Sequence, residues 1–125
     1  SAIMTEIDFR EQPQLIHGFA AAEILGRYGV RDKDIENAVR YHTTGRANMT
    51  LLEKILYLAD YIEPSREFAN DPDVVRLRET VYEDLDRGLL LGLTMTVTEM
   101  EGMGNPVHHD TLDARNDLIE KGVTL

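Results

Sequence analysis

Residues 50–64 of the chain read TLLEKILYLADYIEP, and the pattern predicts one amphipathic helix. Thr50 and Glu53 form a capping box, in which a hydroxyl and a carboxylate satisfy backbone amides of the exposed first turn. Pro64 cannot continue a helix and ends it. Apolar residues recur at helical intervals, and we expect the following to face the core: Leu52, Ile55, Leu56, Ala59 and Ile62.

Asp60 lies on the flank of that apolar face. Removing an ionised carboxylate from water costs several kcal/mol, so it needs a metal, an arginine or several hydrogen bonds as its partner. A local structural ion pair with Arg66 is one reading. A functional site with a bound cation is the other, and Asp60 is therefore a candidate site residue.

A second helix precedes this one, with Asp32 as its cap. Ile35, Ala38, Val39 and His42 fall at i, i+3, i+4 and i+7, which predicts that they share the core-facing side. His42 is then either a hydrogen-bonded core histidine or an inward-facing ligand.

The helix is followed by Thr43-Thr44-Gly45-Arg46. Hydroxyls, exposed amides and a guanidinium suit a phosphate. The same four residues also suit a plain helix stop and turn.

The rest of the chain also favours helices. We expect them over residues 13–28, 74–101 and 111–121, with a break near residues 84–88. Asp71-Pro72 opens the second of these, and Asp110 is placed to cap the last. No stretch predicts a convincing strand, and no repeat or linker divides the chain. The sequence predicts a single all-α domain over residues 1–125.

Composition excludes several classes of protein. The 125 residues contain no cysteine, which rules out disulfides, thiolate metal sites and thiol nucleophiles. A net charge of −10 makes nucleic acid an unfavourable partner, and no apolar run approaches a membrane span. We expect a cytoplasmic protein with neither nucleic acid nor membrane as partner.

The ionisable residues group around the two helix ends. Imidazoles and a carboxylate suit a divalent metal, and arginines suit phosphate oxygens, which points to metal-assisted phosphoester chemistry. The set is His17, His42, Arg46, Asp60, Glu63 and Arg66. His108-His109-Asp110 is a further possible metal motif, but we expect Asp110 to cap a helix there instead.

The order of these motifs resembles the HD-domain phosphohydrolases, specifically the YqeK-type symmetrical diadenosine tetraphosphate hydrolases. The resemblance rests chiefly on Leu15-Ile16-His17-Gly18, on Tyr41-His42-Thr43-Thr44-Gly45-Arg46 and on Ala59-Asp60-Tyr61-Ile62-Glu63-Pro64, with Arg66 and His108. It implies an HD-type helical bundle, a bound iron or other divalent metal, and hydrolysis of diadenosine tetraphosphate to two ADP.

The resemblance also implies roles for single residues. Asp60 matches a metal ligand, and Asp60, His17 and His42 match catalytic positions. The residues that would contact substrate are His17, His42, Thr43, Thr44, Gly45, Arg46, Asp60, Tyr61, Arg66 and His108.

One part of the family pattern is missing. The first histidine and the His-Asp doublet that should precede residue 15 are not in this chain. We expect the C-terminal portion of a longer protein, with the activity in the parent, and either a homo-oligomer or pairing with the missing segment. The alternatives are an HD phosphohydrolase for another nucleotide, a non-catalytic nucleotide-binding domain and a helical interaction module.

Overall fold

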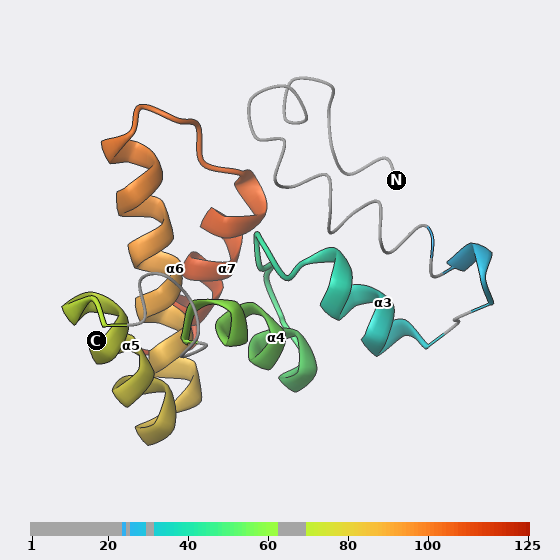
Figure 1. Cartoon of the computed structure of the whole chain (residues 1–125), viewed down its shortest axis with the longest axis horizontal. Helices are drawn as coiled ribbons and strands as arrows, with labels where there is room; N and C mark the ends of the chain where they lie inside the picture. The colour runs from blue at the N-terminus through green and yellow to red at the C-terminus, as the bar shows by residue number, and fades with distance from the viewer. Residues whose placement is uncertain (1–23, 25, 30–31, 63–69) are drawn as a thin grey trace.

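The computed structural model describes residues 24, 26–29, 32–62 and 70–125. Over these ranges it contains helices and no strand, which confirms the all-α prediction (Figure 1). The helices are α3 (Lys33–Arg40), α4 (Leu51–Ile62), α5 (Pro72–Glu83), α6 (Leu85–Gly102) and α7 (His109–Glu120). Most of the predicted helix over residues 13–28, together with His17, Glu63 and Arg66, lies outside the described residues.

The core forms around α6, the longest of the described helices. Its leucine-rich first half packs against α4, α5 and α7. Figure 1 shows α5 and α7 beside α6, with α3 set on the outer side of α4. The main buried cluster consists of Tyr57, Leu58, Leu77, Leu89, Leu90, Leu91, Leu93, Ala114 and Leu118.

The predicted break between two helices is confirmed at Asp84. This residue has an extended backbone, and its amide donates to Thr80 O at the end of α5, while its side chain accepts from the amide of Arg87 at the start of α6. The two helices then cross closely at Gly88, where a Cβ would lie 2.6 Å from Val81 Cγ2 and 2.7 Å from Val81 Cα. Only glycine permits this contact.

Two expectations about buried faces were wrong. In α4 the buried residues are Glu53, Tyr57 and Leu58, whereas Leu52 and Ile55 are 42% and 49% exposed. Ala59, which was expected to face the core, and Asp60, which was expected to be at least half-buried, are exposed as well. The helix is apolar on two sides, so its hydrophobic pattern alone does not select the side that meets α6.

In α3, Ala38 is buried as expected but Ile35 is 43% exposed. Among the described helices α3 packs against α4 alone. The Asp32 cap is confirmed, since its carboxylate accepts from the amides of Asp34 and Ile35. No helix in the described part of the chain is long and apolar enough to cross a membrane.

Candidate functional site

A pocket of about 1020 Å³ lies where α4, α6 and the start of α7 meet the loop after α3. It gathers six of the predicted site residues from three separate stretches of chain. These are His42, Thr43, Thr44, Asp60, Tyr61 and His108. Gly45 and Arg46 do not line it, and His17 and Arg66 lie outside the described residues.

His42 stands at the end of α3 and is half-buried. Its Nδ1 lies 2.6 Å from the carbonyl oxygen of Val39. Because a carbonyl only accepts, Nδ1 must carry the proton, and Nε2 of the neutral ring keeps its lone pair. The backbone therefore prepares His42 Nε2 to accept a proton or to bind a cation, the arrangement common in metal-binding histidines.

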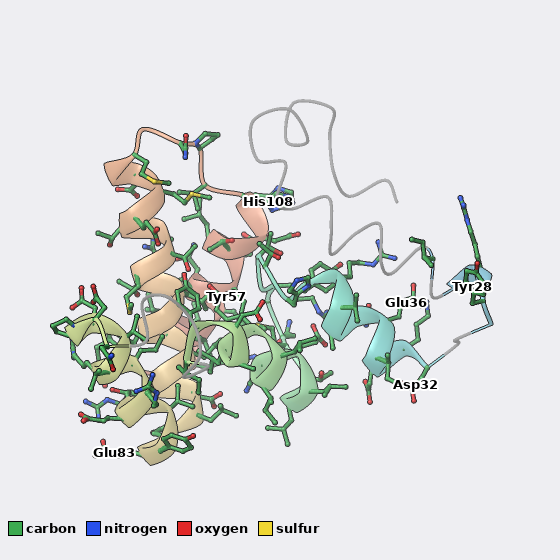
Figure 2. All side chains as sticks on the ribbon, in the orientation of Figure 1. Tyr28, Asp32, Glu36, Tyr57, Glu83 and His108 are labelled. Carbon is green, nitrogen blue, oxygen red and sulfur yellow. The ribbon has the colours of Figure 1, made fainter. Side chains whose placement is uncertain are left out.

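His108 lies at the start of α7 (Figure 2). Its hydrogen bonding is the opposite of that of His42. Its Nδ1 accepts a hydrogen bond from the amide of Asp110 at 3.1 Å, so His108 is the N-cap of the helix. The neutral ring must then carry its proton on Nε2, which makes that nitrogen a donor. Asp110 was expected to be the cap, and this was wrong: the preceding imidazole supplies the acceptor instead.

Arg46 is held by a buried carboxylate. Its Nε and Nη2 donate to Glu53 Oε1 and Oε2 at 2.5 and 2.9 Å, and Glu53 is 1% exposed. Glu53 also completes the predicted capping box with Thr50, at 3.2 and 3.3 Å. Burial works against ionisation of Glu53, but the hydrogen bonds from Arg46 and Thr50 outweigh it and lower its pKa. The ion pair thus fixes the loop that follows His42.

The same loop is packed tightly against α6 and α7. Gly45 has a φ of 71°, which favours glycine, and a Cβ there would lie 3.3 Å from Leu93 Cδ2. The buried Thr111 hydroxyl donates to the carbonyl of Thr44 at 2.8 Å. These contacts place Thr43 and Thr44 on the pocket wall.

The charged residues that line the pocket are mostly acidic. Among the described residues that line it, Asp60, Asp71, Asp73 and Glu99 are acidic and Arg76 is basic. A polyphosphate entering such a pocket would be repelled unless cations accompany it. The role of Asp60 as a metal ligand stays a prediction.

Sequence reasoning named Tyr61 as a substrate contact but missed two further hydroxyls in the wall, those of Tyr57 and Thr96. Tyr57 and Tyr61 of α4 both contact the hydroxyl of Thr96 on α6, and all three line the pocket. Their spacing of four along α4 marks one helix face, but nothing in the sequence points to Thr96.

The described residues do not form a complete metal site. One cluster brings together three possible ligands, His108, His109 and Asp110, within 4.8 Å of one another. However, His108 Nδ1 is occupied by the helix cap, and its Nε2 carries a proton. At the pocket, His42 and Asp60 are suitable ligands, but they are fewer than the three protein ligands of a typical catalytic zinc site.

Comparison with models of known protein families identifies the domain that contains this pocket. The model of the HD domain matches residues 2–65, just over half of the chain. The chain belongs to the HD domain family. This confirms the predicted fold, and membership in the HD domain family implies dependence on a divalent metal.

Relatives of this HD domain carry a specific name. A protein from Halalkalibacterium halodurans, 44% identical over 107 residues, is named bis(5'-nucleosyl)-tetraphosphatase, symmetrical; the match covers 85% of this chain and 56% of the relative. A protein of the same name from Bacillus subtilis is 43% identical over 108 residues, with 86% and 56% covered. The chain spans about half the length of these relatives.

A solved structure supports the fold of this HD domain. It is that of a predicted HD superfamily hydrolase involved in NAD metabolism from Clostridium acetobutylicum. The TM-score is 0.82 at 43% sequence identity, and the match covers 94% of this chain and 61% of that one. The arrangement of helices described above is therefore that of an HD hydrolase.

Proposed function

We propose that this chain carries part of the active site of a symmetrical dinucleoside tetraphosphatase, which hydrolyses diadenosine tetraphosphate to two ADP. The observation that carries the proposal is the pocket itself, which gathers His42, Asp60 and His108 from three distant stretches of chain. The names of the relatives support the choice of substrate.

The two histidines suit different tasks in such a reaction. His42 Nε2 has a lone pair and would accept the proton of an attacking water. His108 Nε2 carries a proton and would donate to a phosphate oxygen. The Thr43 hydroxyl on the same wall would add a second donor to the phosphate.

The cofactor we propose is a divalent metal, with iron as the first choice. Asp60 would be one of its ligands. Because the described residues supply only part of a ligand set, the remaining ligands would have to come from other residues of the parent protein.

The test is product analysis with this chain and diadenosine tetraphosphate, in the presence of added iron or other divalent metals. Release of two ADP, together with metal in the purified protein, supports the proposal. Release of AMP and ATP would contradict symmetrical cleavage. ADP binding without turnover would favour the non-catalytic nucleotide-binding alternative.

A second candidate is hydrolysis of a different nucleotide. The name of the Clostridium acetobutylicum protein, which refers to NAD metabolism, favours this alternative. A panel of mononucleotides and dinucleotides at equal concentration decides between the two. The proposal holds if diadenosine tetraphosphate has the highest kcat/KM.

Association with a second copy or with a missing segment also remains a proposal. It is supported by the exposed apolar side of α4, where Leu51, Leu52 and Ile55 are 63%, 42% and 49% exposed. A stable monomer in size-exclusion chromatography would count against self-association.

A further inference from the structure

The second half of α6 contributes three methionines to the lining of the pocket. They are Met95, Met100 and Met103, and we call them the methionine wall. Met95 and Met100 are half-buried, whereas Met103, the C-cap of the helix, is 59% exposed. The pocket therefore carries three thioethers that solvent reaches to different degrees.

Thioethers are the side chains of this protein that a peroxide oxidises most readily. The 125 residues contain no cysteine, so no thiolate of the chain competes for the oxidant. Hydrogen peroxide transfers one oxygen atom to the sulfur: an S–O bond forms, the O–O bond breaks, the sulfur gives up two electrons, and the second oxygen leaves as water. The product, methionine sulfoxide, is polar where the thioether was apolar.

This change of polarity matters because the methionine wall suits the apolar part of a nucleotide. A thioether makes favourable contacts with an aromatic ring, and the faces of a nucleobase are such a surface. Glu99 belongs to the same half of α6 and also lines the pocket, and its carboxylate disfavours phosphate there. A sulfoxide beneath the base would lose the apolar contact and bury a polar oxygen.

We propose that the methionine wall is an oxidation site, and that its conversion to sulfoxide by a peroxide weakens binding of the nucleoside part of the ligand. The inference rests on the proposed function for its ligand. The order of oxidation follows from exposure: Met103 reacts first, and Met95 and Met100 react more slowly.

The chain offers a matched control in Met49. This residue is half-buried like Met100 and packs against the core cluster, with its sulfur 3.5 Å from where a Cβ at Gly45 would lie. It is not among the described residues that line the pocket. Met49→Leu and Met100→Leu therefore each remove one half-buried thioether and differ in whether that thioether lines the pocket.

The experiment treats the 125-residue chain with hydrogen peroxide and follows each sulfoxide by peptide mass spectrometry. Affinity for ADP and for inorganic tripolyphosphate is measured by calorimetry before and after treatment. We expect oxidation of the wall to weaken ADP binding about fivefold and to leave tripolyphosphate binding within about twofold. Methionine sulfoxide reductases should restore ADP binding.

Two variants assign the effect to the wall. The triple variant Met95→Leu, Met100→Leu, Met103→Leu keeps the volume and apolar character of the wall, so it should bind ADP and retain that affinity after peroxide. Met49→Leu should lose affinity on oxidation as the unsubstituted chain does. Bound ADP should slow oxidation of the wall and leave the rate at Met49 unchanged.

Loss of ADP affinity in the peroxide-treated triple variant would overturn the inference, because the remaining methionines would then be responsible. Equal loss for both probes would also overturn it, since it would indicate general damage to the fold. Full oxidation of the wall with unchanged ADP affinity would overturn it while leaving the proposed function intact. Failure of the untreated chain to bind ADP would count against both.

Discussion

Two sides of the pocket hold a histidine in opposite tautomers. On the loop after α3, His42 donates through Nδ1 to a carbonyl, which leaves Nε2 as an acceptor. At the start of α7, His108 accepts through Nδ1 from an amide, which leaves Nε2 as a donor. The residue type is the same, and the local backbone decides whether Nε2 of the neutral ring accepts or donates a hydrogen bond.

The two sides also differ in how they are anchored. The loop with His42 depends on an ion pair between Arg46 and the buried Glu53, whereas His108 caps α7 through the amide of Asp110. The first anchor should therefore depend on pH and on single charges. The cap of α7 should depend on a hydrogen-bond acceptor at residue 108 that reaches the amide of Asp110.

Removing Arg46 should have the largest effect, because it leaves the Glu53 carboxylate buried without its cation. We expect Arg46→Ala to lower the free energy of unfolding by about 3–5 kcal/mol, measured by urea denaturation. Arg87→Ala, at an exposed position, is the control and should change it by less than about 0.5 kcal/mol. A cost below about 1 kcal/mol would show that the ion pair does not anchor the loop.

His42→Ala should have the next largest effect, this time on catalysis. In the proposed enzyme the loss of the base at Nε2 should lower kcat for ADP release by about 10²–10⁴-fold. His109→Ala is the control, because its side chain is 63% exposed, and it should retain nearly full activity. If His42→Ala stayed within tenfold of the unsubstituted enzyme, the assignment of a base would be wrong.

Acid should weaken the loop side selectively. The pKa of Glu53 is lowered in the folded chain, so its stabilisation is complete above its ordinary pKa of about 4.3 and is lost as the pH falls through the folded value. We expect the unfolding free energy to decline below pH 4.5 and Glu53→Gln to decline less steeply. Parallel curves for the two proteins would contradict this.

The smallest effects should separate the two functions of His108. Asn places an acceptor where Nδ1 lies, so His108→Asn should keep the cap and the stability but weaken ADP binding severalfold. Gln places its polar group near Nε2, so His108→Gln should lose the cap and about 1 kcal/mol of stability. Thermal unfolding and ADP titration of both variants test this, and identical behaviour would refute the division of roles.

The sequence predicted the ends of the helices well. The helix caps act through backbone amides within a few residues, so they can be predicted from short stretches of sequence. They are Asp32, the Thr50–Glu53 box, Asp71-Pro72 and the break at Asp84. The family, the pocket position of His42 and that of Asp60 also followed from local motifs.

The errors arose where contacts between residues far apart in the sequence determine which side chains are buried. Tyr57, and not Ile55, is buried because the Tyr57 side of α4 packs into the core cluster with the leucines of α6, where its hydroxyl contacts Thr96, 39 positions away. Ile35 is 43% exposed, and α3 packs against α4 alone among the described helices. The ion pair of Arg46 and the cap by His108 depend on side-chain geometry that spacing does not encode. The roles of His17 and Arg66 in substrate binding remain predictions.

A single residue, Asp84, connects α5 to α6, and this short connection should let the two helices pair early in folding. Closing this helical hairpin costs little chain entropy, whereas the bond from the Asn48 amide to Asp117 spans 69 positions. We expect the hairpin to be present in the folding transition state and the Asn48–Asp117 contact to form later. In stopped-flow experiments, Leu89→Ala should then mainly slow folding, and Asp117→Ala should mainly speed unfolding.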